Sequence, residues 1–221
     1  MKPMSFLTSW IYALMDSGHE AFTGLGAIQY GGDGFLIRQV VPPYRDDLRV
    51  PLGIGVALMQ CAASTGFTLR AQLSMGESSD VSGTYSEAMQ QKIRDQEYGG
   101  YLGFYRGRVE TFNNMLYNPI LGTSIFNAYR LSKPKGPLFV IDALLSKELT
   151  RQAIAFNDLS NVLEVDWLLY SSGEVEQAVS SCIGKVAIEP REQLLQYLQK
   201  YEEVLPEDWA ASARRLVGEA H

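Results

Sequence analysis

A short glycine-rich segment between two apolar runs constrains the fold of this chain most. Residues 26–30 and 34–41 have the composition of strands. The sequence Gly-Gly-Asp-Gly occupies positions 31–34, so three of its residues lie between the two runs and Gly34 begins the second run. Glycine adopts the positive φ angles of a tight turn without steric cost. Two prolines, Pro42 and Pro43, then end the second run, because proline cannot donate to a strand ladder. The pattern predicts a β-hairpin with an aspartate at its tip.

The rest of the chain alternates between helical and strand periodicities. Leu48, Leu52, Val56 and Met59 recur on one face of a single predicted helix, and residues 68–76 alternate in the manner of a half-buried strand. The predicted helices span 5–17, 46–65, 122–132, 191–203 and 206–218, and the further strands span 68–76, 137–144 and 162–170. This order predicts an α+β fold in which an antiparallel-rich sheet carries its helices mainly on one face.

Charge and residue usage exclude several classes of function. The 221 residues include 19 Lys+Arg and 25 Asp+Glu, which gives a net charge of −6 and argues against a general nucleic-acid binder. There are only two histidines, His19 and His221, so a His-rich zinc site is not expected. Any metal must then be held by carboxylate oxygens, which favours Mg²⁺ or Mn²⁺.

Cysteine usage and hydropathy predict where the protein resides. Cys61 and Cys182 lie far apart in the sequence, and we expect both to be reduced thiols. The longest apolar-leaning run, around 50–63, is shorter than the ~20 residues needed to span a bilayer. The N-terminal stretch does not have the pattern of a secretory signal. These features predict a cytoplasmic protein without a membrane partner.

The hairpin is also the strongest candidate for chemistry. An aspartate at its tip is held by the flanking strands yet open to a ligand, and the glycines allow a bulky anion to approach the backbone. Asp33 in that position is able to hold Mg²⁺ against nucleotide phosphates. The same four residues are also good turn formers with no chemical role.

Three segments in order resemble the catalytic domain of class III nucleotidyl cyclases. The hairpin is similar to the family's glycine-aspartate hairpin, which often reads GDGFL. TLRAQLSMGE at 68–77 resembles the family strand that follows, and GTSIFNAYRL at 122–131 resembles its helix G-x-x-V-N-x-A-x-R-L. Residues 138–142 match the next strand. The resemblance covers roughly residues 5–145.

This resemblance implies a ferredoxin-like or palm-type sheet and a head-to-tail homodimer with shared active sites. The cyclase-like domain is expected at 1–150, with a C-terminal α/β extension at 151–221 packed on it. The implied substrate is a nucleoside triphosphate, and Asp33 matches a metal-binding aspartate. Arg130 matches the arginine that the partner protomer directs at the transition-state phosphate, a role suited to guanidinium.

The sequence departs from the family pattern in two ways that concern metal and ribose binding. The family has a strand with a second metal-binding aspartate before the helix predicted at 5–17, and the sequence shows no counterpart; Asp16 is expected to be a surface residue. The family's helix asparagine aligns with Phe126. Asn127, the candidate replacement, lies one residue further along, about 100° round the helix.

The positions that read the base differ as well. Gln29 occupies the position at which the family has Lys or Glu. The second position that recognises the base in the family corresponds to Pro119, beside Asn118. Neither purine pattern is met, which leaves a pyrimidine nucleotide, as in the cyclases of bacterial anti-phage defence. Tyr30, Gly31 and Gly32 complete the predicted substrate-binding set around the hairpin.

Other interpretations compete with an active cyclase. Residues 30–37 also resemble the loop YGGDEFLI of diguanylate cyclases, with Gly34 in place of its acidic residue, and the palm domain of CRISPR effectors has a similar hairpin. Neither explains the segment 122–131. A different hypothesis is a degenerate, non-catalytic cyclase-homology domain that binds a nucleotide or acts as a partner subunit.

Overall fold

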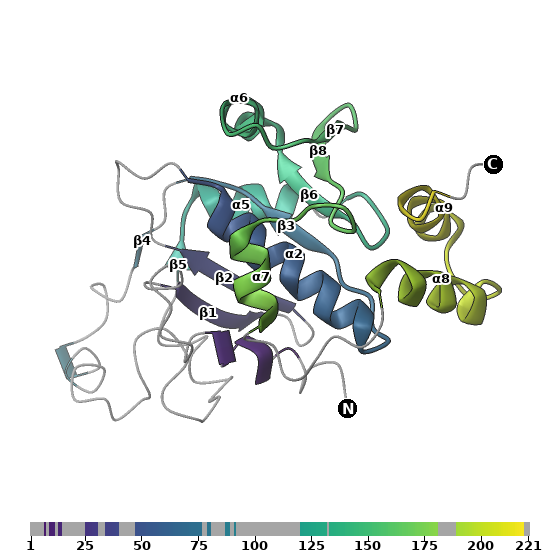
Figure 1. Cartoon of the computed structure of the whole chain (residues 1–221). Helices are drawn as coiled ribbons and strands as arrows, with labels where there is room; N and C mark the ends of the chain where they lie inside the picture. The colour runs from purple at the N-terminus through teal and green to yellow at the C-terminus, as the bar shows by residue number, and fades with distance from the viewer. Residues whose placement is uncertain are drawn as a thin grey trace.

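The computed structural model combines a small hairpin, a four-stranded sheet and flanking helices (Figure 1). It describes residues 7, 9–11, 13–14, 25–30, 34–39, 47–76, 79–80, 87–88, 91, 120–131, 133–180 and 189–218. The positions described within 5–17 are all helical, in agreement with the helix predicted there.

The predicted hairpin is confirmed by its two strands. β1 (Leu25–Tyr30) pairs antiparallel with β2 (Gly34–Gln39), and the register places Tyr30 opposite Gly34. Three residues, 31–33, therefore connect the strands, and they lie outside the described residues.

Helix α2 (Arg49–Ser64) follows the hairpin and supplies the centre of the core. Its face made by Leu52, Val56 and Met59 is buried, as the heptad-like spacing predicts. Gly55 lies on the same helix against the ring of Phe139, at a place where an added Cβ would come within 2.6 Å of the ring. Because Gly55 has no side chain, the backbone of α2 lies close to the sheet.

The main sheet has the strand order β3-β6-β8-β7. β3 (Ala71–Leu73) pairs parallel with β6 (Phe139–Asp142), whereas β8 (Val162–Val165) pairs antiparallel with both β6 and β7 (Asn157–Asp158). β8 belongs to the C-terminal part of the sequence, so residues on either side of position 150 share one sheet.

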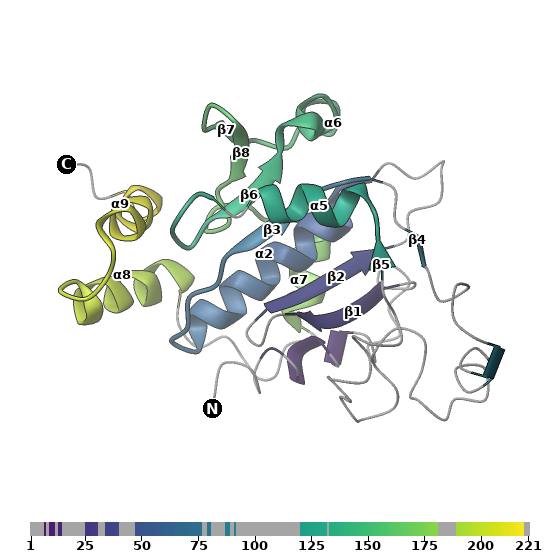
Figure 2. The same cartoon turned by 180° about the vertical axis from the view of Figure 1, so that it is seen from behind.

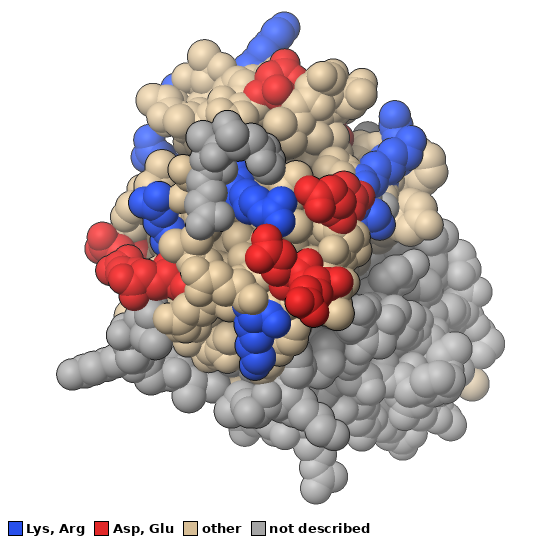
Figure 3. All heavy atoms as spheres, turned by 90° about the vertical axis from the view of Figure 1, so that its right-hand side faces the viewer, with Lys and Arg blue, Asp and Glu red and all other residues tan. Residues whose placement is uncertain are grey.

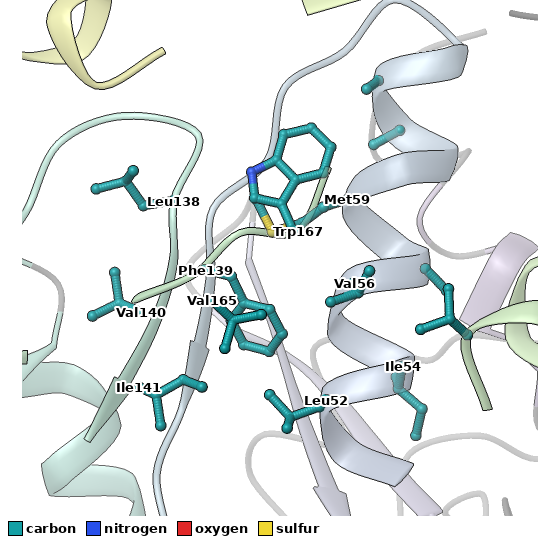
Figure 4. Close-up of a cluster of buried hydrophobic side chains, with 14 of the residues drawn as sticks. Leu52, Ile54, Val56, Met59, Leu138, Phe139, Val140, Ile141, Val165 and Trp167 are labelled. Carbon is teal, nitrogen blue, oxygen red and sulfur yellow. The ribbon is translucent and has the colours of Figure 1, made fainter. Parts of the chain in front are cut away.

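The register places alternate residues of the strands on the two faces of the sheet. Phe139 and Val165 lie opposite one another and point toward α2, together with Trp167 from the end of β8 (Figure 4). The next row, Gln72, Val140 and Glu164, lies on the reverse face. Trp167 is fixed by a hydrogen bond from its Nε1 to the Pro137 carbonyl at 2.6 Å. We call these the α2 face and the Gln72 face.

Helices cover both faces of the sheet. α2 and α7 lie on the viewer's side in Figure 1, and α5 (Thr123–Arg130) lies on the viewer's side in Figure 2. The other elements are β4 (Ser79–Asp80) paired with β5 (Ile120–Leu121), η3 (Ala143–Leu145), α6 (Ser146–Arg151), α7 (Gly173–Ser180), α8 (Pro190–Tyr201) and α9 (Glu207–Leu216).

The coarse α+β prediction is therefore confirmed, and one detail of it is wrong. The four-stranded sheet is mixed but mostly antiparallel, as predicted, with two antiparallel pairings and one parallel pairing. The described helices do not gather mainly on one face, because the Gln72 face carries helices of its own. Cys61 is buried and forms no disulfide, as expected, and Cys182 lies outside the described residues. Among the helices of the described ranges, none combines the length and apolar character needed to cross a bilayer.

Candidate functional site

The predicted site residues of the hairpin are placed only through its strands. Gln29 lies opposite Phe35 and Tyr30 opposite Gly34, at the end of the hairpin where the chain turns. Gly31, Gly32, Asp33 and Asn118 lie outside the described residues. The positions predicted to read the base and hold the metal therefore stay predictions, although the strands predicted to carry them are present.

The predicted catalytic residues Asn127 and Arg130 both lie on α5. Arg130 is the last residue of the helix, and its side chain is exposed. A cation in the last turn interacts favourably with the partial negative charge of the helix C-terminus. Asn127 is half-buried and lies three residues before Arg130 on the same helix.

Polar residues of the strand region around β3 hold α5 on the sheet. Ser74 Oγ donates to the Ser124 carbonyl at 2.6 Å. Gln72, in the amide orientation that satisfies its neighbours, donates to the Ala128 carbonyl at 2.9 Å and accepts from the Arg70 guanidinium at 2.7 and 3.1 Å. These three polar side chains alternate with residues that pack against the core, so they all reach the Gln72 face.

The loop after α5 is attached in the same manner. Arg70 Nη1 donates to the Pro134 carbonyl at 2.7 Å, which ties the loop to the strand. Burial lowers the pKa of Arg70 below its usual value, because the charged guanidinium is partly removed from water. The lowered pKa is still that of a group that carries its charge near neutrality.

This polar attachment leaves the aromatic residues of α5 pointing outward. None of the eight residues of α5, all of which the structure describes, is fully buried. Phe126 and Tyr129 are 63% and 70% exposed, and Arg130 is exposed beside them. Residues three and four apart share a helix face, so two aromatic rings and a guanidinium present one surface.

Basic residues follow α5 in the sequence. Residues 120–141 contain Arg130, Lys133 and Lys135 and no acidic residue. Lys133 and Lys135 are exposed in the loop between α5 and β6. An acidic residue lies on the other side of the helix in the sequence order, because Asp80 of β4 pairs with Ile120 of β5, just before α5.

A second group of charges lies on the Gln72 face and has a structural role. Glu164 is fully buried and accepts two hydrogen bonds from Arg215 of α9, at 2.6 and 2.8 Å. The hydrogen bond with Glu164, opposed by burial, raises the pKa of Arg215. Because the pKa is raised, this contribution is complete at every pH below the usual pKa of arginine and does not change near neutral pH.

The surface around α8 and α9 differs from that around α5. Figure 3 looks onto the side of the molecule that carries these two helices, and acidic and basic side chains are interspersed on it. Arg214 bridges Glu202 at 3.0 Å and Glu207 at 3.3 Å there. Exposed pairs of this kind contribute little, and they give no reason to place a ligand on this side.

No metal centre emerges from the described part of the chain. Within those ranges, no three His, Cys, Asp or Glu side chains come together as a set of ligands. The predicted Mg²⁺ or Mn²⁺ ligand, Asp33, lies outside them, so the cofactor stays a prediction.

Sequence reasoning missed the residues that orient α5. The alternation of Leu69, Ala71 and Leu73 predicts the buried side of 68–76, and the structure confirms it. The polar residues between them, Arg70, Gln72 and Ser74, then had to share the other side. That signal was present, but it does not reveal which element those side chains contact.

Comparison of the chain with protein-family models, with curated proteins and with solved structures found no match.

Proposed function

We propose that the chain is a nucleotidyl cyclase-like protein that converts a nucleoside triphosphate to a 3′,5′-cyclic nucleotide and pyrophosphate. It acts as a homodimer in which each site takes the hairpin of one copy and α5 of the other. A pyrimidine triphosphate is the proposed substrate, with a role in bacterial anti-phage signalling. The proposal rests on the sequence resemblance.

One observation supports it best. The two elements assigned to catalysis are present with the required local form: an antiparallel hairpin closed by residues 31–33, and a helix that ends with an exposed arginine. An exposed guanidinium on the outer side of a helix is free to reach a phosphate bound by another copy. Arginine suits that task because its planar donors match phosphate oxygens.

The proposed reaction is an internal displacement at phosphorus. The substrate 3′-oxygen bonds to the α-phosphorus as the bond between the α-phosphorus and the α–β bridging oxygen breaks. That oxygen leaves as part of pyrophosphate, and the proton of the 3′-hydroxyl passes to solvent. Arg130 of the second copy stabilises the negative charge on the phosphoryl oxygens. A divalent ion near Asp33 would neutralise phosphate charge when bound.

The test is to incubate the purified protein with each of the four ribonucleoside triphosphates and Mn²⁺ and to identify products by mass. Asp33→Ala and Arg130→Ala should each abolish product formation, because one weakens the metal site and the other removes the charge stabilisation. Lys133→Ala is the matched control, a nearby exposed cation without a proposed catalytic role. Full turnover by either catalytic variant overturns the mechanism.

Mixing the two inactive variants tests the shared site. In a mixed dimer, one site has both Asp33 and Arg130 and the other has neither. Random exchange of subunits should therefore restore about one quarter of the wild-type rate. Activity that stays absent after demonstrated subunit exchange contradicts a site built from two copies.

A degenerate domain is the second candidate, and one observation favours it. At the position of the family's ribose-binding asparagine, α5 exposes Phe126, while Asn127 is half-buried. The amide is therefore not simply shifted along the same exposed surface. This hypothesis expects no product from any of the four triphosphates, together with saturable nucleotide binding or formation of a complex with another cyclase subunit.

A further inference from the structure

The loop that leads from α5 to β6 is held by side chains from other parts of the sheet. We call residues 133–138 of this loop the strap. Arg70, which precedes β3, donates from its Nη1 to the Pro134 carbonyl at 2.7 Å. Trp167, which follows β8, donates from its Nε1 to the Pro137 carbonyl at 2.6 Å. Between these two attachments the strap extends from α5 toward α9, as Figures 1 and 2 both show.

The contact between the strap and α9 leaves no room for a side chain. Gly136 is buried and has a φ of +119°, a conformation that residues with a side chain rarely adopt. An added Cβ on Gly136 would come within 2.6 Å of the Cβ of Ser212, which belongs to α9. The left-handed backbone and the close approach each require a glycine at this position. Together they define how the strap lies against α9.

The other end of the strap is joined to the helix end that carries Arg130. Leu131, the residue after α5, is buried, and its N–H donates to the carbonyls of Asn127 and Ala128 at 3.2 and 3.1 Å. One residue of the sequence separates Leu131 from the strap. The backbone of the strap therefore leads directly into the last turn of α5, from which the Arg130 side chain extends.

α9 is itself fixed on the sheet by an oriented contact. Arg215 donates two hydrogen bonds to the fully buried carboxylate of Glu164, on β8. A guanidinium that makes two parallel bonds to a carboxylate fixes orientation as well as distance. Ser212 lies three residues before Arg215, so the two side chains are neighbours on the helix surface. The ion pair therefore determines where Ser212 meets the strap.

We propose that α9 is a positioning element for Arg130 and acts through the strap. Arg215 fixes α9 on β8, Ser212 bounds the strap at Gly136, and the strap holds the last turn of α5. The catalytic meaning of this inference rests on the proposed function, which assigns Arg130 to the transition-state phosphate. The coupling between α9 and α5 is a property of the fold, and it is measured without substrate. α9 then contributes to the site without contacting the substrate itself.

The test displaces the strap from the α9 side and follows α5 by hydrogen exchange in the full chain. Ser212→Leu places a larger side chain beside Gly136, where there is no room even for a Cβ. Exchange of the Leu131 N–H should become about tenfold faster, whereas amides in the middle of α2 should exchange as in the wild type. The indole N–H resonance of Trp167 should shift, because its acceptor is the Pro137 carbonyl.

A matched control and a second variant isolate the contact. Glu207→Leu introduces the same side chain at the start of the same helix, where 83% of the native side chain is exposed. Exchange at Leu131 should stay within about twofold of the wild type. Glu164→Gln/Arg215→Met removes the ion pair without leaving a buried charge, so it loosens α9 on the sheet. It should also accelerate exchange at Leu131, and it serves as the test if the Ser212→Leu chain does not fold.

Turnover gives a readout that a purely structural role of α9 would not change. An arginine that acts on the transition state affects kcat and not the ground-state binding of substrate. Ser212→Leu should therefore lower kcat about tenfold and leave KM within about twofold of the wild-type value. Glu207→Leu should change neither constant.

The outcomes separate this inference from the proposed function. Unchanged exchange at Leu131 in the folded variants overturns the coupling, whatever the enzymatic activity. Acceleration that is equal in α2 overturns it as well, because α9 would then support only global stability. Faster exchange at Leu131 with an unchanged kcat overturns the positioning role. Faster exchange at Leu131 in a chain that makes no cyclic nucleotide supports the coupling and removes the cyclase reaction.

Discussion

The two faces of the main sheet hold their helices by different interactions. On the α2 face, Phe139 and Val165 pack against an apolar helix surface, and Gly55 lets the backbone approach. On the Gln72 face, α5 is held by side-chain hydrogen bonds, and α9 by the Arg215–Glu164 ion pair, while its Ala210, Ala213 and Leu216 are buried as well. The strands are the same, and only the side chains of alternate residues differ.

The two kinds of interaction differ in how strongly they depend on geometry. Apolar burial contributes about 25 cal/mol per Å² and does not depend on a particular partner atom. Hydrogen bonds contribute about 0.5–1.5 kcal/mol each and depend on geometry. We infer that apolar packing fixes α2 on its face, whereas hydrogen bonds position α5 on the Gln72 face and leave its aromatic side exposed.

The largest effect is expected from breaking the ion pair on the Gln72 face. Arg215→Met leaves the fully buried Glu164 carboxylate without its guanidinium. Loss of one partner of a buried pair costs about 3–5 kcal/mol, and we expect the lower end because 45% of the Arg215 side chain is exposed. Urea unfolding monitored by circular dichroism measures the change.

A double variant and a control sharpen this prediction. The double variant Glu164→Gln/Arg215→Met carries no buried charge, so it should be more stable than Arg215→Met at pH 7. Arg214→Met, which removes exposed pairs, should cost less than about 1 kcal/mol. Equal losses for Arg214→Met and Arg215→Met would contradict the argument.

The next effect tests the close approach on the α2 face. Gly55→Ala places a methyl group within 2.6 Å of the Phe139 ring, and overpacking should cost about 1–3 kcal/mol despite alanine's higher helix propensity. Phe139→Leu in the same chain makes room, so the double variant should lose less than the sum of the two changes. Chemical denaturation measures the free energies.

Gly173 supplies the control for that substitution. It is the first residue of another helix, α7, and an added Cβ there meets nothing within 4 Å. Gly173→Ala should therefore be neutral or slightly stabilising. A loss at Gly173 as large as at Gly55 would show that backbone freedom, and not contact with Phe139, decides the outcome.

Periodicity predicted the α2 face better than the Gln72 face. The helical spacing of Leu52, Val56 and Met59 predicts that these residues are buried, and they are. Helix α2 begins and ends within three residues of its predicted limits of 46–65. The burial of Glu164 is not visible in the sequence, because its partner Arg215 is 51 residues away. Local patterns report which side of an element is apolar, but they do not report which distant group satisfies a polar residue.

Element ends and short helices show the same limit. The strand predicted at 162–170 ends at Val165, because the Asp166 carboxylate accepts from Leu168 N at 3.0 Å and starts a turn. Helix α7 was not predicted, although Ser172 accepts from Val175 N at 3.3 Å and acidic residues follow in its first turn. For the candidate site, the sequence located α5 but not the direction in which its aromatic residues point.

The smallest effect separates the two faces within one strand. Gln72→Ala removes the hydrogen bond to the Ala128 carbonyl and should cost about 1 kcal/mol of global stability. Its clearest consequence is local, because α5 loses part of its attachment and opens more often without unfolding of the core. Hydrogen exchange should become faster in α5 and stay unchanged in α2.

Leu73→Ala, at the adjacent residue that packs against the core, is the control: it should lower global stability by about 2 kcal/mol and accelerate exchange throughout the sheet. Faster exchange in α2 after Gln72→Ala would contradict this argument, because it would mean that α5 does not open independently of the core around α2.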